Sequence, residues 1–127
     1  MLYTNRKVRK GAPYGADFEN PFVWHERGKC PIYYTLEIVG GKWKWAILFK
    51  LAMDGVIRYG KLKEFLPPIA HKTLSQQLKE LESSGIIHRE QYNVMPPKVE
   101  YSLTEKGKTL IPMLEMMAKW GREHMAD

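Results

Sequence analysis

The stretch from residue 56 to residue 103 constrains the fold most strongly, because its hydrophobic pattern changes period along its length. A short strand-like run at 56–59 precedes two closely spaced helical segments. Two runs that alternate apolar and polar residues at period two follow, at about 86–92 and 98–103. The connection 93–97 is too long for a tight turn, so it should project as a loop. This order of elements predicts an α+β fold that is mostly helical.

The second helical segment, 71–84, has two different faces. At about 100° per residue, Leu74, Leu78 and Leu81 fall on one narrow stripe that should be buried. The other side is free of acidic residues in its first half. Together with the following hairpin, this is the layout of a winged helix-turn-helix, which reads duplex DNA. The helix residues expected to contact DNA are His71, Lys72, Thr73, Ser75, Gln76 and Lys79.

The hairpin at about 86–103, the wing, adds two cations to this surface. Arg89 lies on its first strand, and Lys98 follows Pro96 and Pro97 on its second. A cation at the base of a wing can reach the DNA backbone or the minor groove. A solvent-facing strand end explains the same residues equally well.

Length and composition limit the classes of protein to which the chain can belong. The chain has 127 residues, enough for one domain plus appendages, and a net charge of +6, which favours polyanionic partners. No apolar run approaches the roughly 20 residues that span a membrane, and the first residues lack the apolar core of a signal peptide. The single cysteine excludes an internal disulfide. We therefore expect a cytoplasmic protein with no membrane partner.

Two regions are expected: an irregular arm at 1–29 and a domain at 30–127. The arm carries a basic cluster at 6–10, which either touches phosphates or is a solvated tail. In the domain, helices are expected at 31–39, 42–53 and 61–66. The helix at 42–53 is apolar on nearly every side and should be the central buried one, and Leu62, Phe65 and Leu66 should face inward from the helix that Gly60 caps.

The last helix, expected at about 105–125 with Thr104 as its N-cap, carries more apolar surface than a small domain should bury. A symmetric partner would cover that surface and pair two recognition helices about one DNA turn apart. The alternative is a core helix of a monomer. Pro112 should kink this helix. The residues expected at the dimer interface are Leu110, Met113, Leu114, Met117 and Trp120.

Several segments together resemble the HxlR-type regulators, relatives of the MarR winged-helix group. The segments are Cys30-Pro31, Gly40-Gly41-Lys42-Trp43, Arg58-Tyr59-Gly60-Lys61-Leu62, the run 74–82 and the run 96–104. The resemblance covers about residues 30–121. It implies a homodimeric transcription factor, usually a repressor, that binds a pseudo-palindromic operator. This chain departs from the pattern at Ala70, where the group usually has a capping Ser, and at His71 and Thr73.

Cys30 is a candidate redox sensor. It lies at the start of a helix, close to Arg27 and Lys29, and both the helix end and the cations should lower the pKa of its thiol. In several members of the resembled group a cysteine here senses oxidants or electrophiles. The alternative is a small buried hydrophobic residue.

Other classes of function find little support. The four histidines are scattered, no metal-ligand spacing or phosphate-binding glycine loop is present, and we expect neither an enzyme nor a cofactor nor a metal. A winged helix that binds proteins rather than DNA is the main alternative. A small effector could occupy a cleft lined by Trp43, Tyr33, Tyr34 and Trp120, although aromatic residues at such positions are more often core.

Overall fold

The computed structural model describes residues 30–126, so the predictions for the arm at 1–29 lie outside the described residues. The chain divides between Gly40 and Gly41 into two compact units. The described part of the first unit contains one helix, α1 (Pro31–Val39). Pro31 lies in its first turn, where its missing N–H costs nothing.

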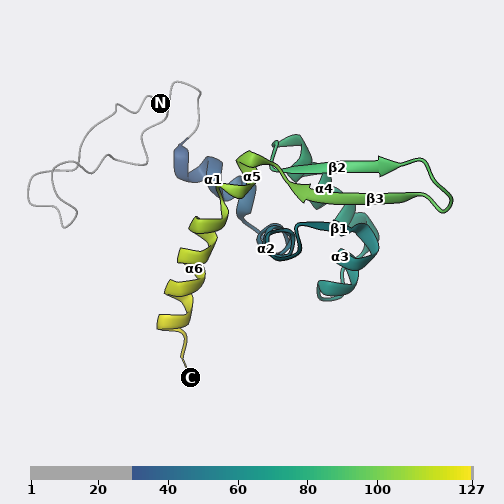
Figure 1. The fold of residues 1–127 in the computed structure, drawn as a ribbon. Coiled ribbons are helices and arrows are strands. Elements are labelled where there is room, and N and C mark those ends of the chain that lie inside the picture. Colours follow the sequence, from purple (N-terminus) through teal and green to yellow (C-terminus); the bar gives the residue numbers. More distant parts are fainter. Residues whose placement is uncertain (1–29, 127) are drawn as a thin grey trace, which may run out of the picture. The chain divides into compact units, whose positions relative to one another are not determined.

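The second unit follows the predicted order of elements closely. Its recognition-helix and hairpin bounds differ from the expected ones by one residue at most. The elements are α2 (Lys44–Asp54), β1 (Val56–Arg58), α3 (Tyr59–Phe65), α4 (His71–Ser83), β2 (Ile87–Tyr92), β3 (Lys98–Leu103), α5 (Glu105–Lys108) and α6 (Ile111–His124) (Figure 1).

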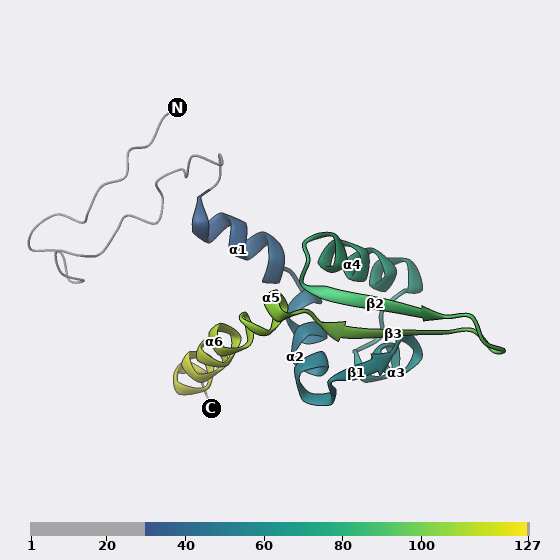
Figure 2. The same ribbon diagram turned by 45° about the horizontal axis from the view of Figure 1, so that its top comes forward.

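The three strands form one antiparallel sheet in the order β1-β3-β2. Arg89 pairs with Tyr101, and Tyr92 pairs with Lys98 at the loop end of the hairpin. In both ribbon views the loop that joins β2 to β3 extends past the helices (Figures 1 and 2). The expected α+β winged helix-turn-helix is therefore confirmed, with the hairpin as its wing.

The core of the second unit lies where α2, α4 and the sheet meet, since α2 contacts α4 and β3 and α4 contacts β2. Its fully buried side chains are Ile47, Leu48, Leu51, Leu62, Leu74, Leu78, Leu81 and Ile86. Burying each contributes roughly 1.5–3 kcal/mol. As expected, α2 is the central helix, since it contacts α4, α6, β1 and β3, although Trp45 and Met53 on it are 47% and 64% exposed.

The helix α3 differs from its prediction at both ends. It begins at Tyr59 rather than after Gly60, with Arg58 as the N-cap residue. Leu62 and Leu66 are buried as expected, but Phe65 is 47% exposed. The ammonium of Lys50 lies over the Phe65 ring, 4.4 Å from its centroid, and this contact accounts for an aromatic ring at the surface.

The predicted last helix is two helices. Thr104 caps α5 as expected, because its hydroxyl accepts a hydrogen bond of 3.0 Å from the Gly107 N–H. The chain then turns, and α6 starts afresh with Pro112 in its first turn. Proline fits a first turn, where no helical N–H is needed, so Pro112 marks a new helix rather than a kink within a long one.

Candidate nucleic-acid interface

The helix α4 buries one row of side chains and exposes the opposite row. Leu74, Leu78 and Leu81 are at most 2% exposed. The exposed row comprises, as predicted, Lys72, Gln76, Lys79 and Ser83. The other predicted contact residues of α4 lie beside that row: His71, which is exposed, and Thr73 and Ser75, which are half-buried.

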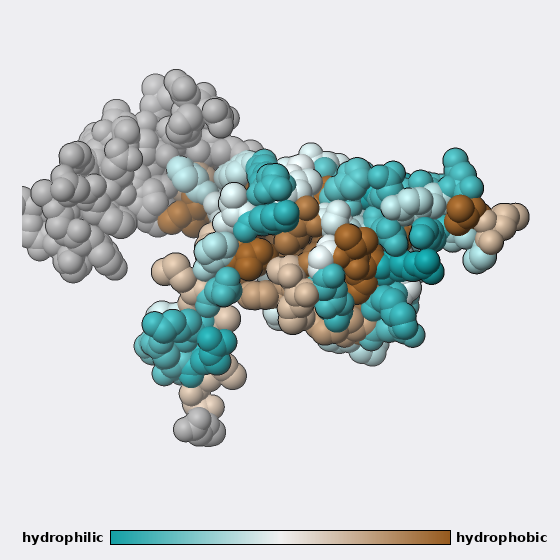
Figure 3. All heavy atoms as spheres, viewed as in Figure 1, coloured by the Kyte–Doolittle hydropathy of each residue, from teal (hydrophilic) through white to brown (hydrophobic). Residues whose placement is uncertain are grey.

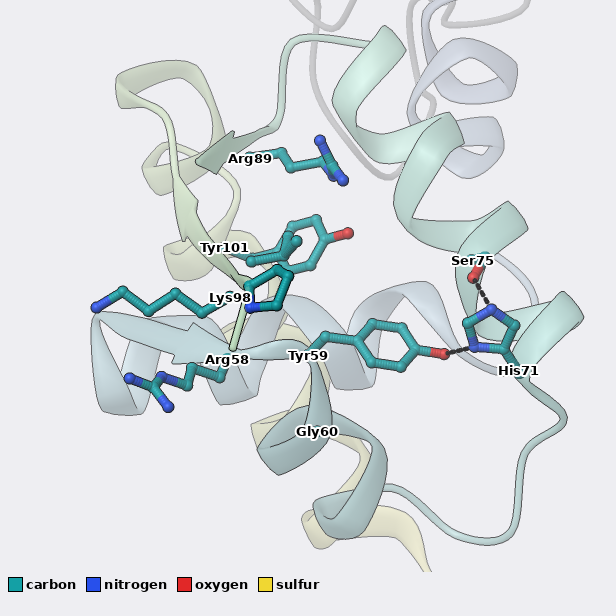
Figure 4. A pocket seen from close by; sticks show the side chains of 10 residues that line it. Arg58, Tyr59, Gly60, His71, Ser75, Arg89, Lys98 and Tyr101 are labelled. Carbon is teal, nitrogen blue, oxygen red and sulfur yellow. Dashed lines mark hydrogen bonds between the residues drawn. The ribbon is translucent and has the colours of Figure 1, made fainter. Parts of the chain in front are cut away.

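The start of α4 lacks a side-chain cap, as the sequence predicts. Ala70 occupies the N-cap position and makes no side-chain hydrogen bond. The His71 ring instead bridges two hydroxyl groups: the Tyr59 Oη lies 2.5 Å from Nδ1 and the Ser75 Oγ lies 3.5 Å from Nε2 (Figure 4). The Tyr59 and His71 rings meet edge to face, with centroids 5.3 Å apart. The first turn of α4 is therefore tied to α3.

Tyr59 is a site residue that the sequence prediction missed. The expected helix began two residues later, so Tyr59 was assigned to a strand-like run with no role. Its position next to Arg58 in one of the motifs shared with the HxlR-type group is the only sequence signal for it. Its contact with His71 joins residues twelve positions apart, which helical periodicity does not reveal.

An open pocket of about 520 Å³ lies between α4 and the wing. Arg89 projects from β2 toward the α4 side of the sheet, as does Tyr101 (Figure 4). This pocket brings a predicted wing cation together with the start of the predicted recognition helix. Its lining residues are Arg58, Tyr59, Gly60, His71, Ser75, Arg89, Pro97, Lys98, Val99 and Tyr101.

Lys98 lines this pocket, but its ammonium group points away from α4. Its side chain and that of Arg58 point away from α4 (Figure 4). The Lys98 Nζ lies 3.9 Å from Glu100 Oε2 and 4.5 Å from the centroid of the Tyr92 ring. The same carboxylate accepts a hydrogen bond from Tyr92 and raises the pKa of its phenol. The two predicted wing cations therefore lie on opposite faces of the hairpin.

The wing tip is apolar. Met95 is 93% exposed and Val94 is 49% exposed, and the space-filling view shows hydrophobic residues at the end of the hairpin (Figure 3). The cations of the wing lie on its strands: Arg89 is in the middle of β2, and Lys98 is at the loop end of β3, next to the tip.

The middle of α4 carries a polar network that reaches α2. The Lys44 Nζ lies 2.7 Å from Glu80 Oε1, and Gln76 Nε2 donates a hydrogen bond of 2.9 Å to Glu80 Oε2. The hydrogen bonds from Lys44 and then from Gln76 lower the pKa of Glu80. One predicted base-contacting residue, Gln76, is thus already engaged by a neighbour on its own helix.

Most of the predicted dimer residues lie on α6, and they differ in exposure. Met117 and Trp120 are 54% and 66% exposed, whereas Leu110 and Met113 are half-buried. Leu114 is 3% exposed. It already packs inside the described chain, where α6 contacts α2, so its assignment to an interface is corrected here to core. Met116 belongs to the apolar surface expected on this helix, although it is not among the five expected interface residues, and it is 73% exposed.

Cys30 is the residue before α1 and is 8% exposed. The helix begins directly after it, as predicted, and the Tyr34 N–H donates to its carbonyl oxygen. Arg27 and Lys29, the cations expected near it, lie outside the described residues.

A groove beside α6 differs from the predicted effector cleft. It has a volume of about 660 Å³. Among the aromatic residues expected to line such a cleft, Trp120 is mainly exposed and stacks on His124, with ring centroids 4.3 Å apart. The groove is lined instead by Leu51, Ala52, Gly55, Val56, Ser102, Leu103, Lys108, Ile111, Pro112 and Glu115.

Within residues 30–126 there is no group of three or more His, Cys, Asp or Glu side chains placed to hold a metal ion. Across the same residues, every helix is too short or too polar to cross a bilayer.

The sequence matches known regulators over most of its length. The HxlR-like helix-turn-helix family model matches residues 38–127. An HTH-type transcriptional regulator of Bacillus subtilis, YdzF, which is uncharacterized, is 50% identical over 93 residues, which are 73% of this chain and 85% of that protein.

Two solved regulators have the same fold. The oxidized form of the redox regulator HypR superposes with a TM-score of 0.70 at 44% identity, over 77% of this chain and all of HypR. The reduced form of the transcriptional regulator YodB from B. subtilis superposes with a TM-score of 0.68 at 34% identity, over 78% of this chain and 99% of YodB. The family and these relatives are transcriptional regulators rather than enzymes. Its fold, its exposed α4 and these matches together show that this chain belongs to the HxlR-like helix-turn-helix family of DNA-binding transcriptional regulators.

Proposed function

We propose that the chain is a sequence-specific repressor that binds duplex DNA as a homodimer. In this proposal α4 enters the major groove and the wing lies along the flanking backbone. The observation that carries the proposal is the exposed row of α4, where Lys72, Gln76 and Lys79 project from a helix anchored by three buried leucines. Repression is the usual mode of the HxlR-type group described above.

The predicted contact residues other than His71 divide between phosphates and base edges in this proposal. Lys72 and Lys79 bind phosphates, while Thr73, Ser75 and Gln76 face the base edges. Arg89 binds a phosphate on the α4 side of the wing. Lys98, on the other face of the wing, binds the DNA backbone across the minor groove, because a wing in that groove has one DNA strand on each side.

Gel shifts with duplexes that flank the coding region test the proposal. Specific binding should weaken steeply with salt, because each bound cation releases a counterion. About eight phosphate contacts per dimer imply a loss of roughly 10³-fold or more in affinity between about 50 and 200 mM salt. A flat salt response, or no shift with any duplex, would favour a protein-binding winged helix instead.

The dimer part of the proposal rests on α6. Met116, Met117 and Trp120 form an exposed apolar surface on one short helix, and a second copy of α6 would cover it. Leu110 and Met113 extend this surface where they remain accessible. Light scattering should give about twice the chain mass, and a monomer at micromolar concentration would contradict the dimer.

We also propose that Cys30 makes DNA binding responsive to oxidants or electrophiles. The support is its place at the start of a helix and the similarity of the chain to HypR, which is a redox regulator. Because Cys30 is 8% exposed, a reagent reaches the thiol only when the surrounding chain opens. With one cysteine in the chain, a disulfide must join two subunits or a subunit and a small thiol.

The test compares DNA release by diamide in the wild type and in Cys30→Ser. The variant should keep its DNA affinity and lose the response. If diamide releases both proteins from DNA equally, Cys30 is not the sensor.

A further inference from the structure

Three side chains of α2 and α4 form a chain of polar contacts that ends on the DNA-facing row. Lys44 on α2 contacts one oxygen of Glu80 at 2.7 Å, and Gln76 donates to the other oxygen at 2.9 Å. Gln76 and Glu80 are one helical turn apart, so the contact lies along the surface of α4. The inner end is well shielded, since the side chain of Lys44 is 12% exposed, while that of Glu80 is 42% exposed.

The carboxylate dictates which way the Gln76 amide faces. An ionised carboxylate only accepts hydrogen bonds, so Gln76 must turn its NH₂ group toward Glu80. One N–H is used in this bond. The carbonyl oxygen and the second N–H remain available on an exposed side chain. An amide that offers one acceptor and one donor together matches the N6 and N7 groups of adenine in the major groove.

Lys44 in turn holds the Glu80 carboxylate in place. A carboxyl with the ordinary pKa of 4.5 is already ionised at neutral pH, and the hydrogen bond from Lys44 is the largest cause that lowers the pKa of Glu80 further. The ammonium also offsets its negative charge. A carboxylate on a helix that faces phosphates would otherwise repel DNA, and this pairing makes its position compatible with the groove.

We propose that Lys44, Glu80 and Gln76 form a positioning chain that presets Gln76 to read an adenine in each operator half-site. Gln76 is the reading residue, and Glu80 and Lys44 are positioning residues that do not touch the base. This inference rests on the proposed DNA-binding function. A purely structural link between α2 and α4 predicts changes in stability but none in base preference.

The first experiment selects bound duplexes from a randomised pool with the wild type. Affinity is then measured for the selected site, for the same site with each adenine replaced in turn, and for unrelated DNA. The wild type should discriminate against one replacement by about tenfold or more, which is the value of a good bidentate contact. Gln76→Ala should lose that discrimination.

Glu80→Ala should change two quantities in opposite directions. Discrimination at the same adenine should fall by about tenfold, while affinity for unrelated DNA should rise by about threefold because one negative charge is gone. Glu82→Ala is the matched control: Glu82 is exposed on the same helix, and within residues 30–126 its side chain makes no hydrogen bond or ion pair. It should raise the affinity for unrelated DNA and leave discrimination unchanged.

Two further variants keep the test interpretable. Glu80→Ala removes one partner of the shielded Lys44 ammonium, so the variant's stability is measured beside its DNA binding. Lys44→Met with Glu80→Ala removes both charges, and this pair should fold and still lose discrimination. In a Gln76→Ala background, Glu80→Ala should cause no further loss, since the two residues act through one contact.

The outcomes separate this inference from the proposed function. If the wild type binds no duplex specifically, both fail. If the wild type discriminates and the folded Glu80 variants discriminate equally well, the positioning chain is refuted and the proposed function stands.

Discussion

The helices α4 and α6 are buried through the same kind of side chain, but they expose different kinds. Each packs leucine against the body of the second unit: Leu78 on α4 and Leu114 on α6 are at most 3% exposed. The outward row of α4 is cationic and polar, with Lys72 as an example, whereas that of α6 is apolar, with Trp120 66% exposed. The buried rows explain the fold, and only the outward rows distinguish a polyanionic partner from an apolar one.

The largest expected effect comes from making α6 resemble α4 in polarity. Met117→Glu with Trp120→Glu should convert the proposed dimer to a monomer, because like charges would meet across the symmetric interface. Both side chains are more than half exposed, so the subunit should stay folded. Analytical ultracentrifugation should show the mass halved, and operator affinity should fall by at least about hundredfold because half-sites are no longer bound together.

Leu114→Ala is the matched control on the same helix. Leu114 is buried within the chain, so this change should lower the free energy of unfolding by about 2–5 kcal/mol without changing the subunit count. A doubly charged α6 that remains dimeric would break the contrast between the two helices.

A smaller effect is expected from removing charge on α4. Lys72→Ala with Lys79→Ala should weaken DNA binding for all sequences by about hundredfold, and the slope of log affinity against log salt should fall by roughly one per lysine removed. Both residues are exposed, so melting temperature should hardly change. Fluorescence anisotropy over a salt series measures this, and an unchanged slope would mean that the lysines do not face phosphates.

Two substitutions near the start of α4 test what holds this helix in place. Ala70→Ser supplies the absent acceptor for the first turn and should raise the free energy of unfolding by about 0.5–1 kcal/mol. Tyr59→Phe removes the hydroxyl that contacts His71 and should lower it by about 1 kcal/mol. Urea unfolding compares them. If Tyr59→Phe has no effect, the ring contact alone ties α3 to α4.

The smallest effect is in the pH dependence of stability. The pKa of Glu80 is lowered from its ordinary value of 4.5 in the folded state, so its contribution is present above that value and is lost as pH falls through the folded pKa. The side chain is 42% exposed, so solvent screening limits the gain to well under about 1 kcal/mol. Urea unfolding at about pH 6 and about pH 3.5 should show a smaller decline in Glu80→Gln than in the wild type. Glu82→Gln, on the same helix, should decline as the wild type does.

The sequence was sufficient for elements whose signals are local. Period-two alternation located β2 and β3, and the leucine spacing located α4, because strands and helices repeat at fixed intervals. Even the absent cap at Ala70 was visible, since capping depends on one residue type at one position.

What was missed depends on contacts between elements. The pairing of Arg89 with Tyr101 puts Arg89 on the α4 side of the wing, and no local pattern fixes which face α4 covers. The Tyr59–His71 contact and the burial of Leu114 have the same origin. Pro112 was misread because a proline signals a kink and a helix start equally well until the preceding turn is seen.

The interruption between α5 and α6 has an evolutionary consequence. Thr104 and Lys106 fasten the α5 segment to Gly85 and Ser84, at the end of α4, whereas α6 starts as a separate helix at Ile111 and packs on α2. Mutations on the outer side of α6 therefore leave the exposed row of α4 unchanged. In duplicated genes for such a chain, subunit pairing and target choice can therefore change through separate mutations, one set on α6 and the other on α4.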